Sequence, residues 1–159
     1  GTFGKALGGA SGGFTSGKKV IIGWLRQRSR PYLFSNTMAP AIVAASIAAI
    51  DLIKSEPQRL EKLRHNAQYF RAGVTKLGFD LIPGEHAIVR VMLYDAPLAK
   101  KMADMLLEEG LYVIAFSFPV VPQGKARIRT QMSSAHDVAH LDKAISAFEK
   151  VGKELGVIK

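Results

Sequence analysis

The chain begins Gly1-Thr2-Phe3-Gly4-Lys5-Ala6-Leu7-Gly8-Gly9-Ala10-Ser11-Gly12-Gly13, a stretch in which small residues surround one lysine. Glycine has no Cβ, so the backbone can approach a neighbouring group closely. The amine of Lys5 can therefore be desolvated and aimed at one reaction partner, as a lysine that forms a Schiff base requires. We predict that Lys5 is a catalytic nucleophile. Because Lys5 lies so close to the start of the chain, we expect this chain to be part of a larger enzyme.

Composition limits the class of protein. The chain has 159 residues and 48% hydrophobic content, which is enough for one core and part of a second. Its net charge is +9, with 22 Lys and Arg against 13 Asp and Glu. A nucleic-acid partner is not expected, because there is no long Lys/Arg run and no zinc-finger spacing. A solvated basic surface and a phosphorylated cofactor or substrate both remain compatible with this charge.

Several other classes of site are excluded or disfavoured. The chain has no cysteine, which excludes disulfides, Cys-ligated metals and thiol catalysis. His136 and His140 have the i, i+4 spacing of metal ligands, but no third ligand accompanies them, so a surface pair is favoured. The longest apolar stretch, residues 39–53, is shorter than the ~20 residues that cross a bilayer. No signal peptide is apparent, and we expect a soluble, cytoplasmic protein without a membrane partner.

The first 50 residues are small, glycine-rich and irregular. We predict a loop to about Gly17 that contains a short strand over 12–16. A helix over 18–28 is expected to bury Val20, Ile21, Trp24 and Leu25, and a strand is expected over 30–34. The apolar helix from Ala39 has a proline in its first turn and is expected to be buried on several sides.

In the rest of the chain, residues that favour helix ends occur at regular intervals. Ser55, Asp95 and Asp137 can begin three amphipathic helices, which Gly78, Gly110 and Gly156 end. Strands are predicted over 88–93, 111–116 and 126–132. This order predicts an α+β domain with helices on one face of a mostly antiparallel sheet. We place the domain boundary near residue 50, with residues 51–159 as the small domain.

Two stretches could hold anions, and a third could form the wall of a pocket. Ser35, Asn36 and Thr37 precede the apolar helix and can bind a phosphate there or simply cap the helix. Arg127 and Arg129 alternate along a strand, so they share one face and can clamp a carboxylate or face solvent at a sheet edge. Residues 118–122 are stiff and apolar and suit a pocket wall.

A phosphate-binding P-loop is a further interpretation of the first stretch. Gly12, Gly17 and Lys18 have the spacing of that motif. Lys19 stands where the motif needs Ser or Thr to bind magnesium, and no apolar strand precedes it. The P-loop interpretation is therefore disfavoured.

Residues 1–9, 30–36, 119–122 and 126–133 together carry a family resemblance. The chain resembles the α-oxoamine synthases, a branch of the fold-type I pyridoxal-phosphate (PLP) enzymes. The resemblance runs from Gly1 to Lys159 and covers about two-fifths of the family's usual chain. It implies an α/β fold in which residues 1–50 are a remnant of the PLP-binding large domain.

The resemblance also implies a role for each site residue. Lys5 would form the Schiff base with PLP and later move the α-proton of the substrate. Thr2 would hold the PLP phosphate, while Ser35 and Asn36 would reach the phosphate in the neighbouring subunit of a homodimer with a shared active site. Arg129 would bind the carboxylate of the amino acid.

The implied activity is the condensation of glycine with acetyl-CoA, because residues 8–13 and 33–36 are most similar to that branch of the family. In the family, the half of the chain before Lys5 supplies much of the PLP pocket, so we expect this chain to be inactive alone. Two alternatives remain open at this point. The chain could be a non-catalytic α+β interaction module, or it could belong to another α-oxoamine synthase.

Overall fold

The computed structural model describes residues 1–5, 7–8 and 11–159. Ala6, Gly9 and Ala10 of the predicted lysine loop lie outside the described residues. The chain forms two compact units, Gly1–Pro57 and Gln58–Lys159, which are described separately below. The composition shift near residue 50 lies inside helix α3 (Pro40–Ser55), shortly before the point where the two units meet in the sequence.

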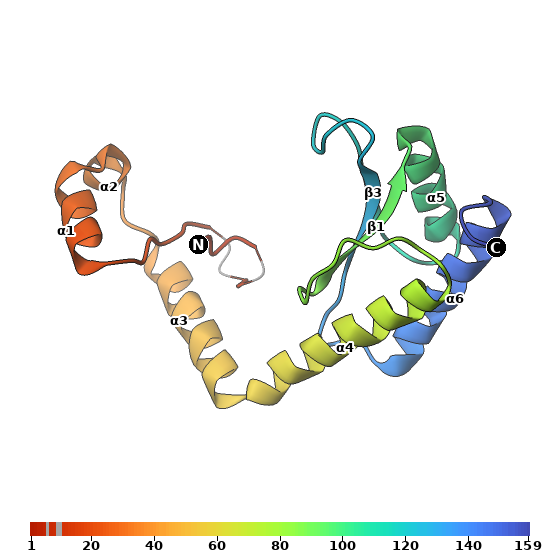
Figure 1. The fold of residues 1–159 in the computed structure, drawn as a ribbon. Coiled ribbons are helices and arrows are strands. Elements are labelled where there is room, and N and C mark those ends of the chain that lie inside the picture. The colour runs from red at the N-terminus through yellow and green to blue at the C-terminus, as the bar shows by residue number, and fades with distance from the viewer. Residues whose placement is uncertain (6, 9–10) are drawn as a thin grey trace. The chain divides into compact units, whose positions relative to one another are not determined.

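The first unit begins with two short segments that pair with each other. Thr2 and Gly13 form an antiparallel bridge, and the Phe3 amide donates a hydrogen bond of 3.0 Å to the Gly12 carbonyl. This single bridge stands in place of the strand predicted over 12–16, so that prediction is wrong in extent. Helices α1 (Lys19–Arg28), α2 (Arg30–Phe34) and α3 follow (Figure 1).

The strand predicted over residues 30–34 is wrong, because these residues form helix α2. Pro31 lies in the first turn, where its missing N–H costs nothing and its fixed φ suits a helix. The Ser35 amide closes the turn by donating to the Pro31 carbonyl at 3.0 Å.

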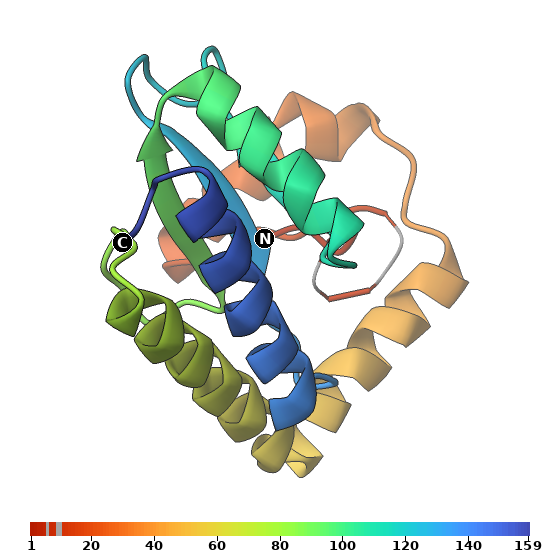
Figure 2. The same ribbon diagram turned by 90° about the vertical axis from the view of Figure 1, so that its right-hand side faces the viewer.

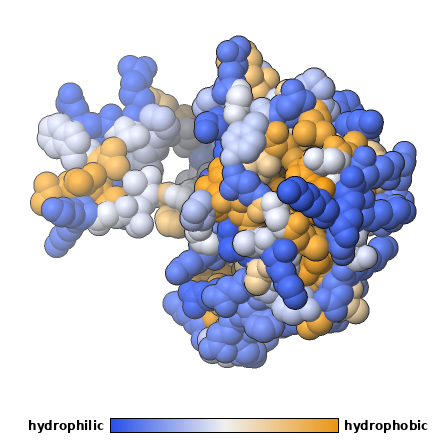
Figure 3. Space-filling view, turned by 45° about the vertical axis from the view of Figure 1, so that its right-hand side comes forward, coloured by the Kyte–Doolittle hydropathy of each residue, from blue (hydrophilic) through white to orange (hydrophobic). Residues whose placement is uncertain are grey.

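The burial predicted for the first unit is also wrong. Val20 is 83% exposed and Trp24 is 66% exposed, although both lie on helix α1 as expected. Helix α3 buries only Ser46. Apolar helix faces become buried only where another surface covers them, and among the described residues of this unit only Phe3 and Ser46 are buried. Figure 3 accordingly shows hydrophobic side chains at the surface of this unit.

The second unit contains a three-stranded sheet and three helices. Its elements are α4 (Pro57–Lys76), β1 (Ile88–Tyr94), α5 (Ala96–Glu108), β2 (Ile114–Phe116), β3 (Ala126–Gln131) and α6 (Val138–Glu154). The strand order is β1-β3-β2 and both pairings are antiparallel. Figures 1 and 2 show α5 and α6 on one face of the sheet, as the sequence predicts.

The core lies between that face of the sheet and the helices. Val89, Val91 and Ile128 alternate toward the core and are fully buried. Phe148 of α6 meets the rings of Phe70 and Phe79 edge-on, with ring centroids 5.6 and 5.7 Å apart. These edge-to-face contacts are favourable because they bring the positive ring edge to the negative ring face. Leu60, near the start of α4, is 39% exposed and lies outside this core.

Most predicted helix ends are confirmed. The Asp95 carboxylate accepts a hydrogen bond of 2.8 Å from the Leu98 amide at the start of α5. Gly78 and Gly110 follow α4 and α5 in the left-handed conformation, with φ of 100° and 83°. The predicted Ser55 cap is wrong, because Ser55 is the last residue of α3 and its hydroxyl donates to the Leu52 carbonyl.

An ion pair joins α4 to the start of α6. Lys62 Nζ lies 2.7 Å from Asp137 Oδ1, and this hydrogen bond and charge hold the pKa of the Asp137 carboxyl below its usual value. The contribution to stability is present above the unfolded pKa and is lost as the pH falls through the folded pKa. Because the pair is exposed, we expect that contribution to be small.

None of the helices in the described part of the chain combines the length and apolar composition that crossing a bilayer requires.

Substitution of two helical glycines by alanine tests how tightly the second unit is packed. A Cβ added at Gly152 in α6 would lie 2.5 Å from the buried Phe79 ring and 3.1 Å from Ile158. We expect Gly152→Ala to lower the free energy of unfolding by about 1–3 kcal/mol, because overpacking outweighs the helix propensity gained.

Gly73→Ala in α4 is the matched control. The nearest atom to its added Cβ is the end of the flexible Ile145 side chain, which can move. Urea unfolding monitored by circular dichroism should show Gly73→Ala as neutral or stabilising. Equal destabilisation by both substitutions would contradict the packing around Gly152.

Candidate functional site

Lys5 lies in the loop between the two paired segments of the first unit. Its carbonyl accepts a hydrogen bond of 3.0 Å from the Gly8 amide. Gly8 and Gly12 adopt φ of 74° and 82°, which residues with a Cβ rarely accept. The glycines predicted to shape this loop therefore have a conformational reason to be there. Lys5 is exposed, and its amine has no ion pair or hydrogen bond with another described residue.

The pairing at the base of this loop depends on close backbone approach. A Cβ at Gly13 would lie 2.6 Å from the Gly1 carbonyl oxygen, so only glycine fits. Phe3 is 8% exposed, and its ring lies 5.3 Å from that of Phe14. The bridge holds Thr2 three residues from Lys5 on the same segment, with its side chain exposed.

Ser35 and Asn36 lie in the segment between α2 and α3. Ser35 is the C-terminal cap of α2, whereas the N-terminal cap of α3 is Ala39, which makes no side-chain hydrogen bond. The prediction that Ser35 and Asn36 stand at the start of the apolar helix is therefore wrong in position. Both side chains are exposed and free to bind a ligand or another chain.

Arg129 lies on β3, the central strand of the sheet, on the face away from the helices. The alternative that it lies at a sheet edge is therefore wrong. Its guanidinium stacks over the Phe116 ring, 5.4 Å from the centroid. The strand places Arg127 on the same face, as predicted from the alternation.

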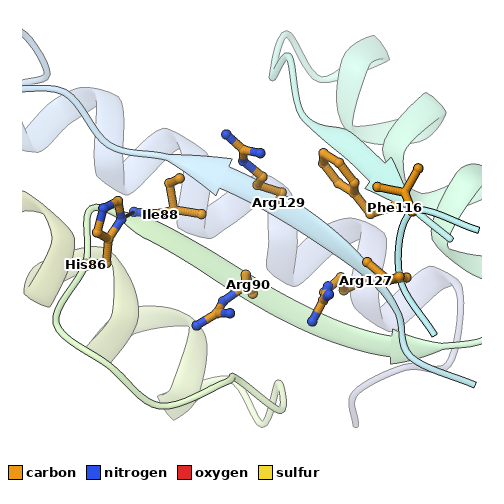
Figure 4. Close-up of a pocket in the computed structure, with 8 residues that line it drawn as sticks. His86, Ile88, Arg90, Phe116, Arg127 and Arg129 are labelled. Carbon is orange, nitrogen blue, oxygen red and sulfur yellow. Dashed lines mark hydrogen bonds between the residues drawn. The ribbon is translucent and has the colours of Figure 1, made fainter. Parts of the chain in front are cut away.

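A hollow of about 480 Å³ covers this face of the sheet (Figure 4). Val120 and Val121 contribute to its wall, so two of the residues 118–122 predicted to suit a pocket wall do line one. Six other residues line it: His86, Ile88, Arg90, Phe116, Arg127 and Arg129. No acidic residue is among the lining residues described, so the pocket suits an anion.

Sequence reasoning missed Arg90 and His86. Arg90 interrupts the otherwise apolar strand β1, and that lone charge is a signal that could have identified it. His86 Nδ1 accepts a hydrogen bond of 3.0 Å from the Ile88 amide. No pattern in the sequence predicts this contact.

The predicted site residues fall into the two units. Thr2, Lys5, Ser35 and Asn36 belong to the first, and Arg129 belongs to the second. The structure brings Thr2 and Lys5 together in one loop and places Arg129 in a separate basic pocket.

His136 and His140, favoured from the sequence as a surface pair, are half-buried and exposed respectively, and both make hydrogen bonds with the backbone. His136 Nδ1 accepts from the Ser133 amide at 3.3 Å, and His140 Nδ1 accepts from the Asp137 amide at 3.1 Å. Both rings thus satisfy backbone donors near the start of α6. Within the described residues, no cluster of three potential metal ligands occurs.

Comparison with known proteins identifies the family of the chain. The sequence pattern of the family "aminotransferase class I and II" matches residues 1–148. The chain belongs to this family. The match includes the Lys5 loop and the Arg129 strand. The family resemblance inferred from the sequence, and with it the α/β fold class, is thereby confirmed.

Individual members of the family are similar along nearly the whole chain. The chain is 54% identical over 158 residues to 2-amino-3-ketobutyrate coenzyme A ligase of Escherichia coli K12, and 46% identical over 157 residues to the human mitochondrial protein of that name. Both alignments cover 99% of this chain. The chain spans only 40% and 38% of the length of these two relatives.

Solved structures of family members share the fold. Serine palmitoyltransferase from S. paucimobilis, with a bound PLP–myriocin aldimine, is 31% identical with a TM-score of 0.90. The enzyme of that name from Sphingomonas wittichii is 29% identical with a TM-score of 0.89. Both alignments cover 99% of this chain and 40% of the other.

Proposed function

We propose that this chain forms part of a PLP-dependent acyltransferase that condenses glycine with acetyl-CoA to give 2-amino-3-ketobutyrate and CoA. The observation that carries the proposal is the 54% identity to 2-amino-3-ketobutyrate coenzyme A ligase, which extends over 99% of the chain. The loop with Lys5 and the pocket with Arg129 supply an amine and a carboxylate receptor, which this chemistry needs.

The residues of the first unit fit PLP chemically. A lysine amine without a partner can bond the aldehyde carbon of PLP, and the Lys5 amine has no partner among the residues that the structure describes. Hydroxyl and amide groups can donate to a phosphate, and Thr2, Ser35 and Asn36 offer exposed groups of this kind. The cavity within the first unit is lined by other residues, among them Phe14, Leu25 and Tyr32. We therefore propose that residues beyond this chain complete the cofactor site.

Each of these residues has a proposed task. When bound, PLP supplies an electron sink that stabilises negative charge at the α-carbon of an amino acid. Arg129 binds the glycine carboxylate through its planar guanidinium. Lys5 accepts the proton that leaves the glycine α-carbon. That carbon bonds to the thioester carbonyl carbon, the carbon–sulfur bond breaks, and CoA leaves as a thiolate that takes up a proton.

We further propose that the active enzyme is a homodimer in which Ser35 and Asn36 donate to the cofactor phosphate of the neighbouring subunit. Their exposed position after α2 is compatible with contact to a second chain. A cytoplasmic location and the reverse reaction in threonine degradation belong to the same proposal.

A second candidate is another α-oxoamine synthase, because 8-amino-7-oxononanoate synthase of Thermosipho melanesiensis is 45% identical over 158 residues. The acyl donors that support turnover distinguish it from the first proposal. The third candidate, a non-catalytic interaction module, predicts that Lys5 does not react with PLP.

Covalent labelling tests the cofactor proposal on the chain itself. We expect PLP followed by borohydride to leave a pyridoxyl group on Lys5, because the Thr2 hydroxyl on the same segment can donate to the phosphate of PLP. Peptide mass spectrometry should find the label on Lys5 in preference to Lys18 and Lys19, which lie exposed in the same unit. Uniform labelling of all three lysines would favour the interaction module.

A chimeric enzyme tests the substrate proposal. In it, this chain replaces the aligned 40% of the Escherichia coli ligase. We expect Arg129→Lys to raise the KM for glycine about 10-fold or more, because lysine keeps the charge and loses the bidentate geometry. Steady-state assays of CoA release measure this. Arg64→Lys, an exposed change on α4, is the matched control and should leave KM unchanged.

A further inference from the structure

Three arginines share the face of the sheet that the helices leave uncovered. Arg90 on β1 is paired with Arg129 on β3, and Arg127 on β3 is paired with Met92. Residues directly opposite in an antiparallel pair have Cβ atoms about 4.5–5.5 Å apart, and diagonal neighbours lie within reach of long side chains. Arg90 therefore lies beside Arg129 and diagonal to Arg127.

These positive charges have no counter-ion among the residues that the structure describes. None of the three guanidinium groups forms an ion pair or hydrogen bond with another described residue. The pocket that they line contains no carboxylate among its described lining residues. Like charges placed opposite each other destabilise a sheet. A bound anion would remove this cost.

The pocket has more volume and more cationic groups than binding of the glycine carboxylate requires. Its volume of about 480 Å³ is far larger than one carboxylate, which a single arginine can bind in a bidentate manner. Figure 4 shows the Arg129 side chain directed away from the side chains of Arg90 and Arg127. Arg90 and Arg127 thus form a second cationic group.

The histidine that lines the same pocket adds a further N–H donor. His86 Nδ1 accepts the Ile88 amide hydrogen, so the proton of the neutral ring lies on Nε2. Two guanidinium groups and one imidazole N–H match the several oxygens of a phosphoryl group better than the two oxygens of a carboxylate.

We propose that Arg90 and Arg127 form a binding site for the phosphoryl groups of a ligand, separate from the carboxylate site at Arg129. Two sources share this chemistry: the phosphates of CoA, and a free phosphate such as pyrophosphate. Only the choice of CoA rests on the proposed function. The arginine cluster stands independently of it.

Thermal unfolding of the whole chain at constant ionic strength tests the site. We expect pyrophosphate and CoA to raise the Tm in a concentration-dependent way, and pantetheine, which lacks phosphate, to have no effect. Arg90→Gln and Arg127→Gln should each weaken the apparent affinity for pyrophosphate about 10–100-fold, as loss of a charge-assisted hydrogen bond predicts. If pyrophosphate raises the Tm and CoA does not, the phosphoryl site is supported and its ligand is a free phosphate rather than CoA.

The control variant is Arg64→Gln/Lys101→Gln, which removes two exposed positive charges elsewhere in the second unit. It should retain the full shift, whereas Arg90→Gln/Arg127→Gln should lose it. Without ligand, Arg90→Gln should raise the Tm by about 2–5 °C, because it relieves the repulsion among the three arginines. A Tm at or above that of the parent chain also shows that the variant folds.

Equal protection of both double variants by pyrophosphate would overturn the proposal. Protection by pantetheine as strong as by CoA would also overturn it, because the contacts would then not involve phosphate. The measurement needs neither PLP nor turnover. Its failure is therefore distinguishable from failure of the acyltransferase proposal, which labelling of Lys5 tests.

Discussion

Replacing Lys5 with alanine in the chimeric enzyme is expected to lower glycine-dependent CoA release by at least about 10²–10⁴-fold. General acid–base catalysis alone contributes on this scale, and Lys5 is also the proposed covalent anchor of PLP. The loop around Lys5 depends on the glycines at positions 8, 12 and 13 rather than on the lysine side chain, which is exposed. The substitution should therefore remove chemistry and leave the fold intact.

Two measurements separate a chemical loss from a structural one. Lys18→Ala, an exposed lysine just before α1, should keep the activity of the parent chimera. Added methylamine should restore part of the activity of Lys5→Ala, because a small amine can accept the α-proton in place of the missing side chain. Full activity of Lys5→Ala without any added amine would show that Lys5 is not the catalytic lysine.

The second unit could be predicted closely because its signals are local. Asp95 caps α5 through its own carboxylate, and Gly78 and Gly110 adopt the left-handed conformation directly after their helices. Such ends depend on a few neighbouring residues and are visible in the sequence. The alternation of Arg127 and Arg129 likewise fixed their common face, because the side-chain period of a strand is two.

The first unit could not be predicted as well, because burial depends on surfaces that local sequence does not describe. Val20 and Trp24 have the spacing of a buried helix face and are nevertheless exposed. Residues 30–34 contain the strand-favouring Tyr32 and Phe34, yet Pro31 and the short hydrogen-bonded turn to Ser35 make a helix. Local propensity is a weak guide over five residues.

Prediction of the candidate site from local sequence was limited in the same way. Lys5 and Arg129 were identifiable from their neighbours in the sequence. The sequence marks Arg90 only as a lone charge in an apolar strand, because its importance comes from its position opposite Arg129 in the register between β1 and β3. That register joins residues about forty positions apart and follows from the packing of both strands on the helices.

Phe148→Ala is expected to lower the free energy of unfolding of the second unit by about 3–5 kcal/mol, which is the usual cost of deleting a buried aromatic ring. Phe148 is fully buried, and its ring contacts both Phe70 of α4 and Phe79 beyond that helix. Removing it takes away two edge-to-face contacts and leaves a cavity between α4 and α6. Urea unfolding monitored by circular dichroism measures the loss.

The size of this effect follows from how narrowly such a domain is stable. Proteins of this size are stable by about 5–15 kcal/mol, so the substitution removes a large share of the total. Phe118→Ala is the matched control, because Phe118 is 62% exposed and its loss should change stability by less than about 0.5 kcal/mol. Phe148→Leu should lie between the two, since leucine fills part of the cavity. Equal stability of Phe148→Ala and Phe118→Ala would mean that the three rings do not form the centre of this core, and the position of α6 on the sheet would then need another explanation.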